Sequence, residues 1–478
     1  MKNAVSRIAI LLALSLLTAV SAAGPASAAD GSPVRGSIHQ AGRWLVDDQG
    51  RAIVVHGMSI PPSGPAAPGV AGVKLLAHEG FTAARIGFTW DRVEPSPGVY
   101  DEKYIAQVLR LESLLGKYGI RTLIEFHQDF WGPSFGYDGA PAWATLGSGV
   151  IESFAAFWKN DPGPGGIGIQ TRFVDAWKHI AGELKGRRNI IGLDPLNEPY
   201  PGSDYPSPCS PFARCPAFER GALPDFYNRV IAAVRSAGAK QVIFPEGVAD
   251  SGKDLPVLPA FADSQTAFNF HFYCDQTLFS AKHVPVGAKS PEAAQCLRAE
   301  RQQIGNFTSY AKKLNVPAFM SEFSANDVNP DNAQVVDLVA PKFTSWTVWQ
   351  YYSGEADTAN PGQGFLVDDT KPASEKNANQ NKLDALSVPY AEATAGTPKT
   401  TSFNRDSRVF TLSYKSEAVP HANLNRQTPT VIFAPARVYP KGYVATVKNG
   451  TVTSKQNASW LLVLAKPHHA VSVRIKPR

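Results

Sequence analysis

Two glutamates that follow short apolar segments are the residues of this chain best suited to acid–base chemistry. Glu198 follows Leu193–Asn197, and Glu322 follows Pro317–Ser321. Two carboxylates at the carboxyl ends of parallel strands can cleave a glycosidic bond, because one protonates the leaving oxygen while the other attacks or stabilises the sugar cation. The separation of 124 residues between positions 198 and 322 suits strands four and seven of a (β/α)8 barrel.

Short apolar segments alternate with helical patterns up to about residue 390. The helical patterns include Tyr104–Tyr118 and Arg172–Leu184, whose apolar residues recur at spacings of three and four. Eight strands alternating with helices predict an α/β fold, a closed parallel barrel whose functional residues lie where the strands end. The eight expected strands are Ile53–His56, Ala83–Gly87, Arg121–Phe126, Ile191–Leu196, Gln241–Phe244, Thr266–Phe270, Ala318–Ser321 and Thr344–Trp349.

Both ends of this region have a different character. Before the barrel, Arg43–Val46 and Ala52–Val55 flank a polar turn and predict a β-hairpin. After residue 390, a small and turn-rich stretch leads into alternating segments that predict a C-terminal antiparallel β-sandwich. These segments are Val409–Tyr414, Pro429–Phe433, Trp460–Leu464 and Val471–Ile475. The predicted domains are therefore a barrel over 29–390 and a sandwich over 391–478.

The first 28 residues resemble an export signal. Lys2 and Arg7 precede the apolar run Ile8–Val20, which is too short to span a bilayer, and Ala26–Ala28 is a small-residue cleavage site. We therefore expect residues 1–28 to be a signal peptide and the protein to be secreted.

Four cysteines in an exported chain suggest two disulfides, for which three connectivities exist. The pairing of nearest neighbours would join Cys209 to Cys215 and Cys274 to Cys296. Their spacing is not that of a zinc site, so neither a metal nor another cofactor is expected.

The formal net charge of +6 is small for 478 residues, and no run of lysine or arginine is present. We therefore expect no nucleic-acid partner. The charge could mildly favour contact with an anionic membrane surface, although solubility explains it better. We expect a monomer.

Polar residues gather at the predicted strand ends, where burial without partners would be costly. Convergence on one rim is expected of an active site. Besides the two glutamates, the candidate substrate-binding residues are Arg85, His127, Asp129, Asn197, His271, Tyr273 and Trp349.

Each candidate can be given a chemical role. Glu322 would be the nucleophile, kept ionised by Arg85 and the Tyr273 hydroxyl. Glu198 would be the acid/base, whose pKa must be raised by burial and by the neighbouring carboxylate. Asn197 could hydrogen-bond the sugar 2-hydroxyl. A flat platform for a sugar ring could come from Trp349.

Structural interpretations stand beside these roles. Arg85 could dock a surface helix, His127 could be a satisfied core histidine, and Asp129 could cap the following loop. Tyr273 and Trp349 could be core aromatics. Four further carboxylates near strand ends are interpreted as supporting residues: Glu125, Asp194, Glu246 and Glu355.

Taken together, Asn197-Glu198-Pro199, Glu322-Phe323 and the Arg, His, Tyr and Trp set resemble glycoside hydrolase family 5. Further motifs resemble its endoglycoceramidase subgroup, as does the all-β tail after AGTP at Ala395. These motifs are EPSPGVY at Glu94, HQDFW at His127, GAPAWAT at Gly139, LNEPYPG at Leu196 and GFLVDDTKP at Gly364.

The resemblance implies a retaining glycosidase that releases the whole glycan of a glycosphingolipid from ceramide. Glu198 matches the acid/base and Glu322 the nucleophile, and the sugar-binding set is Asn197, His127, Asp129, Tyr273 and Trp349. Members of the subgroup carry a sugar-contacting lysine after strand one, whereas His56–Gly64 contains none. This departure leaves the glycan specificity open.

A two-tailed lipid also needs an apolar groove beyond Glu198. Aromatic residues in the loops after strands three and six could line it or could simply pack those loops onto the barrel: Phe130, Trp131, Phe135, Tyr137 and Phe279. Two other functions compete. One is an endo-β-glucanase, or a β-glucosidase acting on glucosylceramide or a steryl glucoside. The other is a non-catalytic carbohydrate- or lipid-binding protein, which the presence of both glutamates with Asn197 disfavours.

Overall fold

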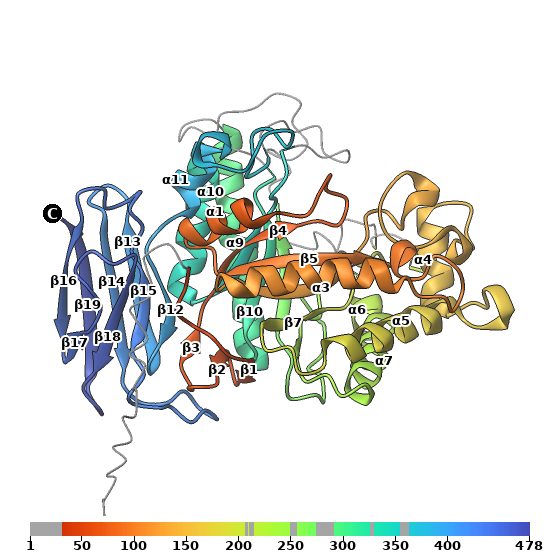
Figure 1. Ribbon diagram of the computed structural model, residues 1–478. Helices are drawn as coiled ribbons and strands as arrows, with labels where there is room; N and C mark the ends of the chain where they lie inside the picture. Colours follow the sequence, from red (N-terminus) through yellow and green to blue (C-terminus); the bar gives the residue numbers. More distant parts are fainter. Residues whose placement is uncertain are drawn as a thin grey trace, which may run out of the picture.

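Eight parallel strands curl into a barrel in the computed structural model, which describes residues 31–205, 209, 215–248, 256–273, 291–325, 329–353 and 363–478 (Figure 1). The first and last strands of the sheet, β8 and β9, are joined by the parallel bridges Ile243↔Thr266 and Glu246↔Asn269, which close the barrel. The strands in spatial order are β8 (Val242–Ile243), β7 (Ile190–Asp194), β6 (Arg121–His127), β5 (Ala83–Thr89), β4 (His56–Ile60), β11 (Ser345–Val348), β10 (Ala318–Phe323) and β9 (Phe268–Phe272).

Helices cover the outside of the barrel (Figure 1). In α3 the Asp101 side chain caps the first turn, accepting hydrogen bonds from two backbone N–H groups, and the buried face of this helix packs against β5 and β6. The helices are α1 (Val70–His78), α2 (Trp90–Val93), α3 (Glu102–Lys117), α4 (Val150–Lys159), α5 (Ile169–Leu184), α6 (Pro216–Arg220), α7 (Ala222–Ser236), α9 (Pro291–Leu314), α10 (Asn329–Val339) and α11 (Gln380–Leu386). Short 3-10 turns lie at η1 (Pro133–Phe135), η2 (Ala142–Ala144), η3 (Pro164–Gly166), η4 (Ala340–Lys342) and η5 (Glu375–Asn377).

The predicted barrel is confirmed, with one correction at its first strand. The sequence places that strand at Ile53–His56, whereas β4 begins at His56 and runs to Ile60. Residues Ala52–Ile53 instead form β3, which pairs with β2 in the predicted N-terminal hairpin. Because the run from Ala52 to Ile60 is buried throughout, its pattern does not reveal where one strand ends and the next begins.

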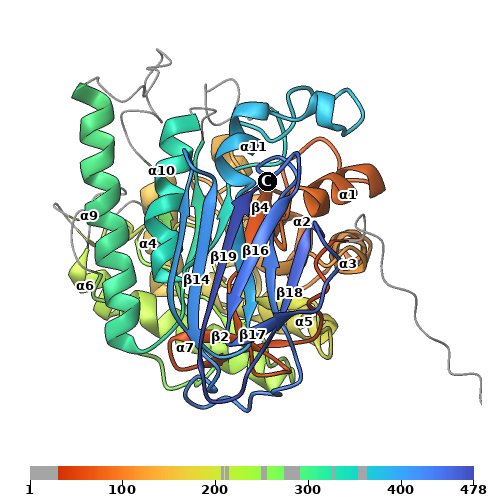
Figure 2. The same cartoon turned by 90° about the vertical axis from the view of Figure 1, so that its left-hand side faces the viewer.

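The predicted C-terminal sandwich is also present, and its strands lie on one side of the barrel, seen from the side in Figure 1 and face-on in Figure 2. Its four-stranded sheet has the order β13 (Thr397–Asn404), β14 (Val409–Lys415), β19 (Ala470–Pro477), β16 (Tyr443–Lys448). The seven-stranded sheet has the order β1 (Ile38–Ala41), β2 (Trp44–Asp47), β3, β12 (Tyr390–Thr394), β15 (Thr430–Phe433), β18 (Trp460–Ala465), β17 (Gly450–Val452).

The sandwich is not built from C-terminal residues alone. Strand β12 pairs with β3 through Ala393↔Ile53, so the N-terminal hairpin and the tail share one sheet. A buried ionic cluster lies at the amino end of the barrel, where Nη1 of Arg121, the first residue of β6, is 3.3 Å from Oε1 of Glu392 on β12. The Ser32 hydroxyl donates to the other Glu392 oxygen. These contacts tie the tail to the barrel.

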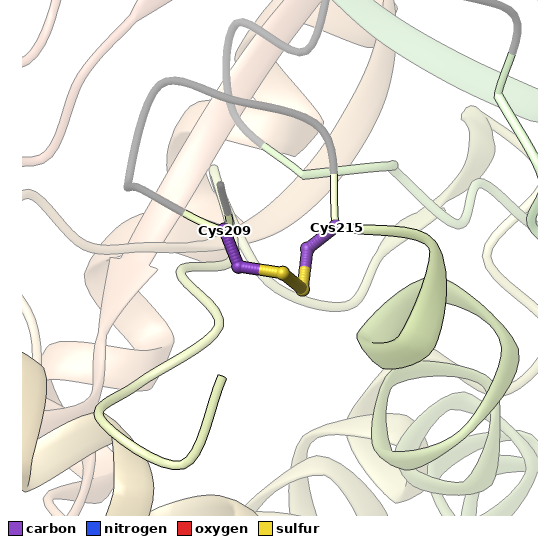
Figure 3. Close-up of a disulfide and its surroundings, with 2 residues drawn as sticks. All are labelled: Cys209 and Cys215. Atoms are coloured by element: carbon purple, nitrogen blue, oxygen red, sulfur yellow. A yellow bond between two sulfur atoms is a disulfide. The ribbon is translucent and has the colours of Figure 1, made fainter. Parts of the chain in front are cut away.

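Cys209 and Cys215 form a disulfide directly before α6, with their Cα atoms 4.7 Å apart (Figure 3). This confirms the first predicted pair. Cys296 is also disulfide-bonded, while its predicted partner, Cys274, lies outside the described residues. In the part of the chain that the structure describes, no helix combines the length and apolar character needed to cross a membrane.

Candidate active site

All nine candidate residues belong to one continuous set of contacts at the carboxyl ends of the barrel strands. Arg85 lies on β5, His127 ends β6, and His271 and Glu322 lie on β9 and β10. The others lie just beyond strand ends: Asp129 after β6, Asn197 and Glu198 after β7, Tyr273 after β9, and Trp349 after β11. Strand ends therefore bring together residues that are far apart in the sequence.

Glu322 is held from two sides. The Tyr273 hydroxyl donates to its Oε2 at 2.7 Å, and Nη1 of Arg85 donates to its Oε1. Burial raises the pKa of Glu322, although the Arg85 guanidinium opposes this rise. The sequence suggested that the neighbours would dominate, whereas the cost of desolvating a buried carboxylate outweighs them.

Glu198 shares a partner with Glu322. His271 Nδ1 is 2.9 Å from Glu198 Oε1 and 3.5 Å from Glu322 Oε2, so these two carboxylate oxygens are at most about 6.4 Å apart, the sum of the two distances. The Glu198 side chain is 19% exposed and that of Glu322 is 6% exposed. Glu198 is thus the carboxylate that is more open to solvent.

Arg85 is the central cation and is fully buried, which excludes the surface interpretation. Its Nη2 lies 2.5 Å from Glu125, 2.9 Å from Asp194 and 2.8 Å from Asn197 Oδ1. Burial lowers its pKa, but Glu125, Asp194 and Glu322 together hold that pKa well above its usual value. Arg85 therefore connects strands β5, β6, β7 and β10 through charge.

His127 lies between two carboxylates, with Nδ1 3.3 Å from Glu125 and Nε2 3.1 Å from Asp129. Burial opposes protonation, yet Glu125 and Asp129 raise the pKa of His127 well above its ordinary value. His127 is a cation rather than an ordinary core histidine. The ring of Trp349 stacks on it at 5.7 Å between centroids, and this indole is only 5% exposed.

Several further residues complete the centre. Glu125 and Asp194 bind Arg85, and Asn269 Nδ2 donates to Asp194 Oδ2 at 3.0 Å. Glu125 lies two positions before His127 on β6, so both side chains point into the barrel, and this spacing was a signal in the sequence. Of the four supporting carboxylates named from the sequence, Glu355 lies outside the described residues.

The sequence analysis did not identify one further buried lysine, which contacts the backbone at the ends of β10 and β11. Lys382 on α11 is fully buried, and its Nζ donates to the carbonyl oxygens of Trp349 at 2.6 Å and Ser324 at 2.7 Å. The lysine therefore ties the ends of β10 and β11 to a helix more than thirty residues downstream. No motif around Lys382 indicates this role.

The one described group that could hold a metal ion consists of Glu198, Glu246 and His271, whose ligand atoms lie within 4.8 Å of one another. A bound cation would occupy the carboxylate that must exchange a proton in the predicted chemistry. Burial lowers the pKa of His271 to about 4, so its imidazole is neutral. The absence of a cofactor stays a prediction.

Comparison with known families decides the class. Residues 46–355 match the family described as cellulase (glycosyl hydrolase family 5), and residues 389–476 match the glycoside hydrolase family 5 C-terminal domain. The chain belongs to glycoside hydrolase family 5. It is a glycosidase with the family's C-terminal domain, as the sequence motifs indicated.

Individual relatives extend over nearly the whole chain. Endoglycoceramidase I of Rhodococcus hoagii (strain 103S) is 25% identical over 467 residues, covering 91% of this chain and 87% of the relative. An endoglycoceramidase of Cyanea nozakii is 24% identical over 481 residues, covering 88% of each. The solved structure of endo-glycoceramidase II from Rhodococcus sp. has a TM-score of 0.71 at 21% identity, covering 91% of this chain and 99% of that one. The structural likeness confirms the two-part fold.

Proposed function

We propose that this glycosidase cleaves the β-glycosidic link between glycan and ceramide in glycosphingolipids by double displacement, with Glu322 as nucleophile and Glu198 as acid/base. The observation that carries the mechanism is the single imidazole nitrogen, His271 Nδ1, that contacts both carboxylates. Inverting enzymes separate their carboxyl groups by about 6.5–9.5 Å to admit a water, and retaining enzymes by about 5 Å. Because both carboxylates contact one nitrogen, one oxygen of each lies within about 6.4 Å of the other, as the close spacing of a retaining enzyme requires.

The surroundings of the two glutamates support their separate roles. Arg85 and Tyr273 fix both oxygens of Glu322, as a nucleophile that must attack from one direction requires. Glu198 is more exposed and contacts a neutral histidine, so it can pass a proton to a leaving group and recover one from water.

Asn197 can still bind sugar although both ends of its amide are occupied. Its Oδ1 accepts from Arg85 at 2.8 Å, and its Nδ2 donates to the Gln128 carbonyl at 2.9 Å. An amide has a second N–H and a second lone pair, so one donor remains for the sugar 2-hydroxyl.

Support for a ceramide substrate comes from the relatives named endoglycoceramidases and from part of the loop after β6. There Phe130 lies 4.8 Å from Tyr137 and 5.6 Å from Tyr200 between ring centroids, and Tyr137 is 37% exposed. Trp131 does not contribute to a groove, because it is 3% exposed and packs against Phe154. Phe279 lies outside the described residues.

We also propose that the protein is secreted and works as a monomer at or near a membrane surface. The Cys209–Cys215 disulfide supports an oxidising compartment. The apolar substrate supports membrane contact, since a two-tailed lipid resides in bilayers and micelles.

The decisive experiment is incubation of the mature protein with a panel of glycosphingolipids in detergent, followed by assays for free ceramide and for the released glycan. Soluble β-glucan, glucosylceramide, a steryl glucoside and an aryl β-glucoside complete the panel. We expect ceramide and an intact glycan from at least one glycosphingolipid. Rapid degradation of β-glucan with every glycosphingolipid intact would instead support the glucanase, and failure on all substrates would support the binding protein.

A further inference from the structure

A third glutamate lies beside the two catalytic candidates, and no lysine or arginine among the described residues forms an ion pair with it. Glu246 follows β8 and is 2% exposed. Among the described residues, the only basic group within 4 Å of its carboxylate is His271, whose Nδ1 is 3.5 Å from Glu246 Oε1. That imidazole is neutral because burial lowers its pKa to about 4. The other inner carboxylates, Glu125, Asp194 and Glu322, each contact Arg85.

The Glu246 carboxyl group contacts the acid/base candidate through two routes. Its Oε2 accepts the backbone N–H of Glu198 at 3.4 Å. Its Oε1 lies beside His271 Nδ1, the atom that is 2.9 Å from Glu198 Oε1. Because three carboxylates face this nitrogen, its proton is best placed on Nδ1 and directed to the nearest of them, Glu198.

The position of Glu246 is itself fixed by an outer helix. The Tyr227 hydroxyl on α7 donates to the Glu246 carbonyl oxygen at 2.8 Å and accepts from the Glu246 N–H at 3.1 Å. The parallel bridge to Asn269 holds the same residue from β9. Glu246 is therefore a rigid support.

Glu198 needs such support because its backbone is strained. Its φ is 42°, in the left-handed region, which is unfavourable for a residue other than glycine. Gln128 Nε2 donates to the Glu198 carbonyl oxygen at 2.8 Å, while Glu246 accepts from its N–H. The two side chains hold the strained residue from both sides.

We propose that Glu246 is a positioning residue for the acid/base, which keeps its proton and holds Glu198 and His271 in place as a neutral carboxylic acid. This inference rests on the proposed role of Glu198. A neutral support matters most after the glycosidic bond is cleaved, when Glu198 has given its proton to the leaving group. A negative charge on Glu246 would then repel the ionised Glu198.

Charges on every neighbouring element bear on the Glu246 proton. Burial first, then the carboxylates of Asp194 and Glu198, raise the pKa of Glu246 well above its usual value, Glu322 adds to this rise, and Arg85 opposes it. The groups that face Glu246 are Asp194 on β7, Glu198 and Tyr200 after β7, Arg85 on β5, His271 on β9, Glu322 on β10 and Tyr227 on α7. Ionisation of all the carboxylates would leave negative charge in excess of the cations Arg85 and His127.

The kinetic test compares two substitutions on the full chain. Glu246→Ala removes the support, so we expect kcat/KM to fall about 10²-fold or more on a substrate with a poor leaving group and much less on an activated aryl β-glycoside. Glu246→Gln is neutral, keeps the shape of the side chain and presents a carbonyl to the Glu198 N–H, so it should restore most of the loss. At high pH the wild type should lose activity as Glu246 ionises, and Glu246→Gln should lack that component of the alkaline limb.

An infrared difference measurement detects the proton without relying on activity. At neutral pH, the wild-type spectrum minus that of Glu246→Gln should contain the carbonyl stretch of a protonated carboxylic acid. Glu300→Gln is the matched control, because Glu300 on α9 is another buried carboxyl group, whose burial and contact with Asp331 raise its pKa to about 9. This control should remove its own acid band and leave the pH–rate profile unchanged.

Each outcome has a distinct meaning. Equal losses in Glu246→Gln and Glu246→Ala at neutral pH, or a difference spectrum that shows only a lost carboxylate, would overturn the inference. If the wild type hydrolyses no β-glycoside, the proposed function fails, while the infrared spectrum still decides whether Glu246 holds a proton. If Glu246→Ala does not fold, Glu246→Gln and its spectrum decide alone.

Discussion

The buried charges at the two ends of strand β6 differ, because they are paired one to one at the amino end whereas carboxylates are in excess at the carboxyl end. At the amino end, Arg121 meets Glu392, and a second buried pair, Arg51 and Asp47, lies on the adjoining hairpin. At the carboxyl end, Glu125 and His127 belong to a cluster in which carboxylates outnumber the cations.

The difference separates a structural use of charge from a chemical one. The ion pair of Arg121 and Glu392 at the amino end joins the barrel to the tail, since Glu392 belongs to β12 and Arg121 to β6. Excess carboxylates at the carboxyl end cannot all ionise, so some keep protons that can be transferred. One strand therefore links a cluster that joins two domains to a cluster that we propose exchanges protons.

The largest expected effects concern activity and are confined to the carboxyl end. Glu322→Gln should reduce kcat by about 10⁴-fold or more on every substrate, because no nucleophile remains. Glu198→Gln should cost about 10²–10⁴-fold with poor leaving groups, whereas activated aryl glycosides should still form the glycosyl-enzyme. On those substrates added azide should raise turnover, because it attacks the glycosyl-enzyme without a general base. Steady-state kinetics on matched substrates measure both, and equal losses on all substrates would contradict the assignment.

The next effect concerns stability and contrasts the two arginines. Arg85→Met leaves buried Asp194 and Glu125 without their cation, so unfolding by urea should show a loss of about 3–5 kcal/mol. The double variant Arg121→Met with Glu392→Gln removes both partners and should cost less than about 2 kcal/mol. A double variant as unstable as Arg85→Met would show that the two ends do not differ in this way.

A smaller effect is the pH dependence contributed by Glu392. Burial raises its pKa in the folded state to about 7 despite Arg121, above the value of about 4.5 expected when unfolded. The folded state therefore binds more protons between these values, and this contribution to stability falls as pH rises from about 4.5 to 7. The difference in unfolding free energy between wild type and Glu392→Gln should change across that window, and a constant difference would exclude the raised pKa.

The smallest effect is on the acidic limb of the profile of activity against pH. Because the pKa of Glu322 is raised, activity should fall as pH drops through that raised value and Glu322 becomes protonated. Tyr273→Phe removes a hydrogen bond to the ionised form, so the limb should move to higher pH by about one unit. A profile of kcat/KM against pH that moves the other way would contradict this account of Glu322.

The sequence predicted the barrel and the sandwich, and it predicted that the nine candidate residues would lie together, because a strand end fixes where a side chain lies. It misplaced the first barrel strand, because the buried run Ala52–Ile60 carries no break. It could not assign separate roles to Glu125, Asp194 and Glu246, since those roles depend on which of the three carboxylates contacts Arg85. Lys382 was missed because its contacts come from a helix outside the repeating pattern.

The central claim is that Glu322 attacks the sugar, and covalent trapping tests it most directly. A 2-deoxy-2-fluoro β-glycoside with a good leaving group slows hydrolysis of the glycosyl-enzyme, so peptide mass spectrometry can locate the attached sugar. We predict one sugar on the peptide that contains Glu322, with no label in Glu322→Gln and slower labelling in Tyr273→Phe. Label on the Glu198 peptide, or hydrolysis of natural substrate with inverted anomeric configuration, would contradict the account.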